Sequence, residues 1–197
     1  MNNIFKSAAA ATIILAGLIS SSAQAAEKVP FAGVIIVPAM AQPETQVETQ
    51  SPFKRGKIVA YASSKKAGSI IVNTKTNRLY FVIDANQAVM YRVATAKKGF
   101  EWSGVNKVSA KTQWPDWRPP VEMLQRRPEL PTYMAGGPKN PLGARAIYLG
   151  SSIYRIHGTN EPSSIGKAVS SGCIRMLNAD VSELYNFVKQ GAEVTVM

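Results

Sequence analysis

The sequence contains one histidine, His157, and one cysteine, Cys173, and both lie in a short polar segment rich in glycine and serine. A cysteine attacks as the thiolate, and a nearby imidazole can take the thiol proton. Gly172 directly precedes the cysteine, and a glycine there allows successive backbone amides to turn toward one point, where an oxyanion could be bound. The segment therefore indicates nucleophilic catalysis, with Cys173 as nucleophile and His157 as base.

Arg175 lies two residues beyond the cysteine, where a fixed cation could bind a substrate carboxylate. Each of these residues also has a simpler interpretation. A lone cysteine often packs as a small hydrophobic residue, a lone histidine is often a hydrogen-bonded core residue, and Arg175 could be a surface charge or half of a structural ion pair. The catalytic interpretation depends on their joint occurrence in one polar segment.

The same counts argue against metal or cofactor chemistry. One histidine and one cysteine cannot by themselves assemble a zinc site, which needs at least three protein ligands. The sequence also contains no phosphate-cradling glycine loop and no dinucleotide-binding fingerprint. We therefore predict no metal and no cofactor.

The segment resembles the active-site signature of the L,D-transpeptidases, the YkuD-type enzymes of the bacterial cell wall. Their pattern is a histidine, a dozen or more residues, and then Ser/Thr-His-Gly-Cys, often followed by an aliphatic residue and Arg or Asn. The matching residues here are HGT at 157–159, SSIG at 163–166 and SSGCIR at 170–175. The resemblance extends to GGPKNPLGAR at 136–145 and, more loosely, over residues 68–197. Ser171 stands where the family usually has a second histidine, so a substrate contact made by that imidazole would be missing.

The resemblance implies roles for individual residues. Cys173 would be the nucleophile, His157 the base, and the carbonyl of Gly158 the group that orients the imidazole. The oxyanion hole would be formed by the backbone amides of Ser171, Gly172 and Cys173. The residues expected to contact the substrate are Arg175, Ser170, Thr159 and Asn160.

The implied reaction is transpeptidation of peptidoglycan in the periplasm. Cys173 would form a thioester with a tetrapeptide stem, release D-alanine and transfer the acyl group to a diaminopimelate amine, giving a 3-3 cross-link. Two alternatives use the same thioester: transfer to a lysine or N-terminal amine of an outer-membrane protein, or hydrolysis by water as an L,D-carboxypeptidase. An alternative of another class is a non-catalytic peptidoglycan-binding module.

The first residues indicate export. Residues 1–25 read as a signal peptide, with Lys6 before a short apolar run and an A-x-A cleavage site at 23–25. The formal net charge of +11 would become +10 after cleavage, because this segment carries one lysine and no acid. So basic a chain suits an anionic polymer or surface, and export argues for the cell envelope rather than nucleic acid. We predict no stable membrane span after cleavage.

The remaining sequence predicts a flexible proline-containing leader over 26–60 and a catalytic domain over 61–197. Its fold is expected to be mainly β, a YkuD-like sandwich or barrel with a short C-terminal helix after the cysteine loop. Runs rich in Val, Ile, Tyr and Phe, separated by turn residues, predict strands over 69–73, 78–83, 88–94, 105–112, 144–149, 153–156 and 192–196. Asn178 is predicted to cap the helix after the cysteine.

The segment from 113 to 141 contains seven prolines, which exclude much regular structure apart from a possible helix over 121–126. Long loops on a rigid β scaffold often carry binding surfaces. Trp114, Trp117 and Tyr133 could line a groove for sugar or peptide, or could instead cover the edge of the core.

Overall fold

The computed structural model describes residues 51–197, so the predicted signal peptide and most of the predicted leader lie outside the described residues. The strands are β1 (Lys57–Ala60), β2 (Ile70–Asn73), β3 (Arg78–Val82), β4 (Gln87–Arg92), β5 (Thr95–Ala96), β6 (Gly104–Gln113), β7 (Arg145–Leu149), β8 (Arg155–His157), β9 (Ala168–Ser170), β10 (Ile174–Arg175) and β11 (Glu193–Val196). The helices are α1 (Val121–Arg126) and α2 (Asn178–Phe187), with a 3-10 turn over Pro162–Ser164.

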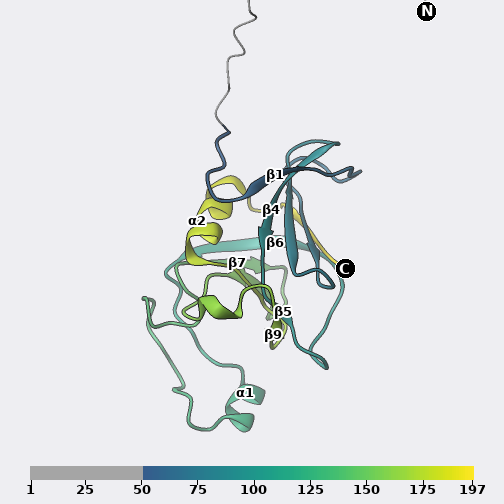
Figure 1. Ribbon diagram of the computed structural model, residues 1–197. Helices are drawn as coiled ribbons and strands as arrows, with labels where there is room; N and C mark the ends of the chain where they lie inside the picture. Colours follow the sequence, from purple (N-terminus) through teal and green to yellow (C-terminus); the bar gives the residue numbers. More distant parts are fainter. Residues whose placement is uncertain (1–50) are drawn as a thin grey trace, which may run out of the picture. The chain divides into compact units, whose positions relative to one another are not determined.

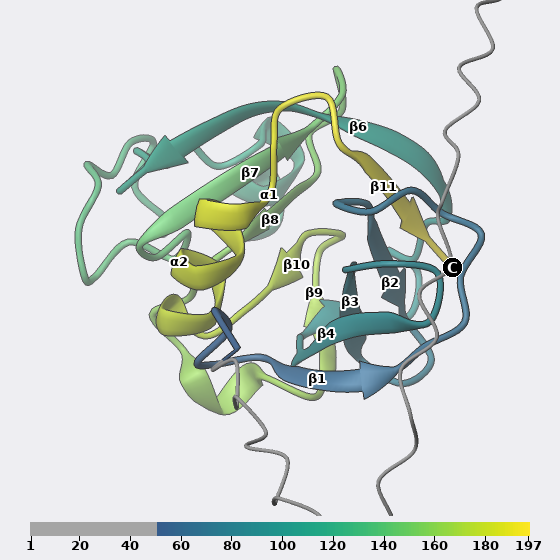
Figure 2. The same ribbon diagram turned by 90° about the horizontal axis from the view of Figure 1, so that it is seen from above.

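Nine of these strands form one sheet in the order β1-β4-β3-β2-β11-β6-β7-β8-β10, and β5 pairs with β9 beside it. Most neighbours are antiparallel, but β11 is parallel to β2, and β10 is parallel to β8. Figure 1 shows these strands above the loop that carries α1, and Figure 2 shows the sheet curling around the core with α2 along its open side. The prediction of a mainly β fold with a short helix after the cysteine is confirmed.

The predicted strands over 69–73, 78–83 and 88–94 form, and they pair where turn residues separate apolar runs. β2 pairs with β3 and β3 with β4, both antiparallel, in registers that place Ile70 beside Phe81 and Leu79 beside Tyr91. Asn77, in the turn between β2 and β3, has a φ of 51°, a left-handed conformation that asparagine tolerates better than most residues. The predicted helix over 121–126 is also present, as α1.

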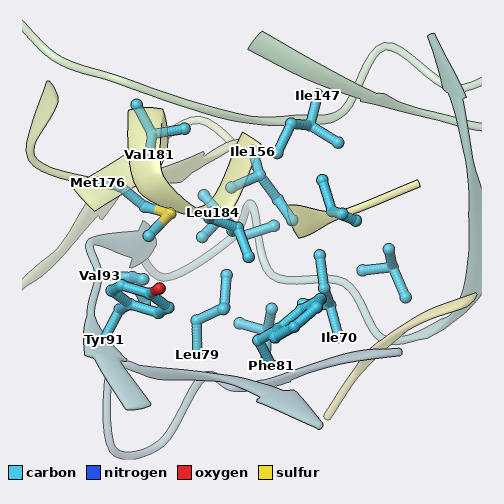
Figure 3. Close-up of a cluster of buried hydrophobic side chains, with 14 of the residues drawn as sticks. Ile70, Leu79, Phe81, Tyr91, Val93, Ile147, Ile156, Met176, Val181 and Leu184 are labelled. Atoms are coloured by element: carbon cyan, nitrogen blue, oxygen red, sulfur yellow. The ribbon is translucent and has the colours of Figure 1, made fainter. Parts of the chain in front are cut away.

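The core lies inside the curled sheet, between the strands and α2. Figure 3 shows Ile70, Leu79, Ile147, Ile156 and Leu184 meeting there, each fully buried. Burying a side chain of this size contributes about 1.5–3 kcal/mol relative to leaving it in water. Because Ile147 and Ile156 belong to β7 and β8 and Leu184 to α2, this packing fixes the helix against the strand that ends in His157.

Residues before β2 also pack on this core. β1 pairs with β4, and the ring of Phe53 lies 4.2 Å from that of Phe187, centroid to centroid. The Glu183 carboxylate accepts hydrogen bonds from the backbone amides of Lys54 (2.6 Å), Arg55 (2.9 Å) and Gly56 (2.9 Å). The folded unit thus includes residues that the sequence analysis places in the leader.

The start of α2 differs from the prediction. The helix begins at Asn178, its N-cap position is Leu177, and no side chain caps it. The prediction that Asn178 is the cap is therefore wrong, and the reason is that its amide group bonds to two other segments, described below. Within residues 51–197, no helix is long and apolar enough to cross a membrane.

Candidate active site

The candidate site is built on the parallel pair β8 and β10. Their register places Ile156 opposite Ile174 and His157 opposite Arg175. Both isoleucines are buried in the core. Successive side chains of a strand point to opposite faces, so His157 and Arg175 lie on the other face. Cys173, one residue before Ile174, shares that face and is the diagonal neighbour of His157 across the strand pair.

Backbone hydrogen bonds hold β10 in place on both sides. Arg175 exchanges two with Ala94, at 2.8 and 2.9 Å. On the other side, the amide of Met176 donates to the carbonyl of His157 at 2.8 Å. The strand that follows the cysteine is therefore tied directly to the histidine.

His157 is buried, with 4% of its surface exposed, and its Nδ1 lies 2.6 Å from the carbonyl oxygen of Gly158. A carbonyl can only accept, so Nδ1 carries the proton and Nε2 is left as the acceptor. The pKa of His157 is lowered to about 3, chiefly by burial and also by the charges of Arg175 and Arg155, against the opposing effect of the Gly158 and Leu142 backbone. The imidazole is thus neutral at neutral pH, and the Gly158 carbonyl fixes the orientation of its ring.

Asn178 holds the segment that carries this carbonyl. Its Oδ1 accepts hydrogen bonds from the amides of Ala144 (3.0 Å) and Thr159 (3.1 Å), and its Nδ2 donates to the Thr159 carbonyl (3.0 Å). A Cβ on Gly143, whose φ is +64°, or on Gly158 would collide with Oδ1. Two glycines therefore make room for one side chain that fixes the backbone after His157.

The loop before Cys173 is held by three contacts. The Ser170 hydroxyl donates to the Cys173 carbonyl (2.6 Å) and accepts from the Gly172 amide (3.2 Å). Trp102 Nε1 donates to the Gly172 carbonyl (2.7 Å), and its indole stacks on Tyr154 with centroids 4.5 Å apart. Gly172 has a φ of +112°, and a Cβ there would press on the Tyr154 ring. Glycine is therefore required by conformation and by space.

The thiol of Cys173 is partly exposed at the end of this loop. Burial raises its pKa, while the charge and the backbone amide of Arg155 and the charge of Arg175 oppose the rise. At neutral pH the site therefore combines a neutral thiol with a neutral imidazole. If Cys173 is to act as a nucleophile, its thiolate therefore has to be generated by proton transfer to a base.

His157 and Cys173 both line a cavity of about 330 Å³, within the size range of small-ligand sites. Asn160, Ser171 and Arg175 also line it. The proline-rich loop supplies another wall, to which Trp117, Pro120, Met123, Leu130 and Met134 contribute. Of the three aromatic residues of this loop considered for a groove, Trp117 lines the cavity, and the lining residues do not include Trp114 or Tyr133.

The other predicted site residues differ in whether their polar groups are already engaged in hydrogen bonds. Ser170 lines the cavity, but its hydroxyl is used within the loop, and the Gly172 amide is engaged by that hydroxyl. Thr159 is 2% exposed, and its hydroxyl accepts from the Glu161 amide. Among the described residues, the amides of Ser171 and Cys173 have no hydrogen-bond partner, which leaves them as donors for the predicted oxyanion hole.

Arg175 is paired: its Nη1 lies 3.1 Å from Glu161 Oε2. Neither Glu161 nor Arg155 stands out in the sequence, although both line the cavity. The positions of Trp102 and Tyr154 beside the cysteine loop are likewise not apparent from the sequence. No motif identifies these residues, because they come to the site only through the pairing of strands and loops.

Comparison with known proteins shows the family to which the chain belongs. Residues 67–196 match the YkuD family, described as the L,D-transpeptidase catalytic domain. The chain belongs to this family. A probable L,D-transpeptidase of Escherichia coli, ErfK/SrfK, is 36% identical over 135 residues, which are 65% of this chain and 43% of the relative. A putative L,D-transpeptidase of Bacillus subtilis, YqjB, is 36% identical over 133 residues, covering 64% of this chain and 69% of the relative.

The chain spans less than half the length of its Escherichia coli relative. Solved structures of L,D-transpeptidases share its fold. A C442S mutant of the Enterococcus faecium L,D-transpeptidase has a TM-score of 0.55 at 16% identity, covering 68% of this chain and 50% of that one. L,D-transpeptidase 3 of Mycobacterium tuberculosis has a TM-score of 0.54 at 14% identity, covering 66% and 60%. At these identities the likeness concerns the fold alone.

Proposed function

We propose that this L,D-transpeptidase acts in the periplasm on peptidoglycan, with Cys173 as the nucleophile that forms a thioester with a tetrapeptide stem. Family membership supports a cell-wall transpeptidase. The observation that carries the assignment of the nucleophile is the position of Cys173, diagonal to His157 on one face of β8 and β10 and within one cavity.

In the first half-reaction, the Cys173 thiol gives its proton to Nε2 of His157 while the sulfur attacks the carbonyl carbon that precedes the terminal D-alanine. The backbone amides of Ser171 and Cys173, which have no hydrogen-bond partner among the described residues, donate to the resulting oxyanion. The C–N bond then breaks, the proton moves from Nε2 to the leaving nitrogen, and D-alanine departs from a thioester.

In the second half-reaction, an amine attacks the thioester and Nε2 takes the amine proton. The C–S bond breaks, the thiolate regains a proton, and a new peptide bond remains. Throughout, Nδ1 stays bonded to the Gly158 carbonyl, 2.6 Å away, so the same nitrogen handles every proton. A diaminopimelate side-chain amine as acceptor gives the 3-3 cross-link.

Mass spectrometry of residues 26–197 with a disaccharide tetrapeptide tests this proposal. We expect a dimer lacking one D-alanine, and an acyl-enzyme mass on Cys173 during turnover. The Cys173→Ala protein lacks the nucleophile and should form neither species, whereas His157→Ala removes the positioned base and should slow their formation by about a hundred- to ten-thousand-fold.

The products also separate the alternatives. A tripeptide without dimer would indicate hydrolysis, or an acceptor amine that the mixture lacks. Product formation by the Cys173→Ala protein would refute the nucleophile. If the folded wild-type protein binds the tetrapeptide but releases no D-alanine, a non-catalytic binding module becomes the better description.

A further inference from the structure

Arg155 is a second arginine beside the cysteine, and it lies one strand away from it. Continuing the register of β8 and β10 by one residue places Arg155 opposite Cys173, on the same face as His157. Arg155 lines the cavity, and its charge is the leading influence that favours the thiolate form of Cys173. Its position relative to the sulfur is therefore fixed by the sheet rather than by a loop.

The guanidinium of Arg155 has no polar partner among the described residues. Its Nε is buried without a hydrogen bond. Within residues 51–197, the Arg155 side chain forms no ion pair and no hydrogen bond. The guanidinium instead lies over the face of Tyr148 in a cation–π contact, with its central carbon 5.4 Å from the ring centroid. Arg175, in contrast, is already paired with Glu161 at 3.1 Å. Of the two arginines, Arg155 is the uncompensated charge.

Arg155 is half-buried, and a guanidinium in this position without a polar partner is well suited to bind a carboxylate, because its donors form a rigid fork that fits two oxygens. In the proposed reaction the nearest substrate carboxylate is that of the leaving D-alanine. It is separated from the carbonyl carbon under attack by three bonds, so by at most about 4 Å. Adjacent strands are about 4.8 Å apart, so this carboxylate can reach the strand that carries Arg155 when the carbonyl lies at Cys173.

We propose that Arg155 binds the terminal carboxylate of the D-alanine that leaves, and so restricts the donor to stems that end at the residue after the scissile bond. This inference rests on the proposed function and adds the residue that selects the donor. It also assigns the carboxylate contact to Arg155 rather than to Arg175, the residue that the sequence suggests.

The test compares two donor peptides, a tetrapeptide with a free terminal carboxylate and the same peptide with a terminal carboxamide. We expect the wild-type protein to prefer the acid by about a hundredfold in kcat/KM for D-alanine or D-alaninamide release, a typical effect for a desolvated charge pair. Arg155→Gln should bring the ratio of acid to amide close to one, and Arg155→Lys should restore part of the preference. Arg118→Gln serves as the matched control, since Arg118 is exposed and pairs with Asp116 outside the cavity.

The outcomes distinguish this inference from the proposed function. An unchanged ratio in Arg155→Gln, or a ratio lost in Arg175→Gln but not in Arg155→Gln, would overturn the role of Arg155 and leave the transpeptidase assignment intact. Release from neither peptide by wild-type protein would overturn both. If Arg155→Gln does not fold, Arg155→Lys is compared with wild type instead, because lysine keeps the charge but lacks the forked guanidinium. A KM for the free-carboxylate peptide equal to that of wild type would then refute a bidentate contact.

Discussion

Protonation of His157 should be the main cause of acid destabilisation between pH 7 and pH 5. The folded protein holds this imidazole neutral, with a pKa of about 3 against an ordinary value of 6.5. Because the folded-state pKa of this base is depressed, the unfolded chain binds the proton more readily, so stability falls as the pH drops below about 6.5. With these two pKa values, the expected loss between pH 7 and pH 5 is about 2 kcal/mol.

The assay is urea unfolding followed by tryptophan fluorescence at pH 5, 6, 7 and 8, with wild-type and His157→Gln proteins side by side. His157 is the only histidine in the sequence, so the difference between the two pH dependences isolates a single group. Every carboxylate, including Asp180 and Glu183, is present in both proteins and cancels. We expect the free energy of unfolding of wild type to fall by about 2 kcal/mol more than that of His157→Gln from pH 7 to pH 5.

The interval from pH 7 to pH 8 provides an internal control, because histidine protonation there contributes only about 0.1 kcal/mol. Parallel pH dependences for the two proteins between pH 7 and pH 5 would refute the reasoning. They would mean that the imidazole becomes charged inside the fold, and that His157 loses its capacity as a base below its ordinary pKa.

Three further predictions concern the residues around the catalytic pair. Asn178→Ala removes three hydrogen bonds and should lower the free energy of unfolding by about 1–3 kcal/mol, which chemical denaturation would measure. The kcat of this variant should fall by a larger factor than its KM rises, which steady-state kinetics would check. Gly172→Ala should slow alkylation of Cys173 by iodoacetamide or change its pH dependence, because the new Cβ meets the Tyr154 ring at a φ of +112°; an unaltered alkylation profile would contradict the loop geometry. Ser171→His should fold and still acylate, since the family usually has histidine there, and an acyl-enzyme mass equal in yield to wild type would support this.

Much of the fold could be predicted from the sequence because its signals are local. The run Ile70–Asn73 and the run Arg78–Val82 are apolar segments separated by turn residues, and pairing between neighbours along the chain is the usual outcome. The helix over Val121–Arg126 follows two prolines and ends before another, so its bounds were also readable.

The sequence could not reveal which distant strands are neighbours. β11 lies between β2 and β6, and β10 lies beside β8, and no local pattern encodes either choice. The same limit explains the site. His157 and Cys173 stand out because each is the only residue of its type, whereas Arg155 is one of many cations and matters only because of its register.

Asn178 was wrongly predicted as the helix cap because the preference of asparagine for that position considers only the local sequence. Asparagine before an apolar helical pattern is a good cap on local grounds. In the folded protein its amide group instead satisfies the backbone of Ala144 and Thr159, which come from two segments earlier in the chain. A buried side chain that can satisfy three backbone groups outweighs a single capping bond.

The position of β11 has a consequence for how the protein is made. It is the last described strand in the chain, yet it joins the β1-β4-β3-β2 half of the sheet to the half that contains β8 and β10. Until it emerges during synthesis, β2 exposes an unpaired edge with the apolar residues Ile70, Ile71 and Val72, which is a template for association with other chains. Closure of the sheet is therefore delayed until nearly all of the described chain is available. If the protein is exported in an unfolded state to the periplasm, where we propose that it acts, that delay would keep the polypeptide competent for translocation.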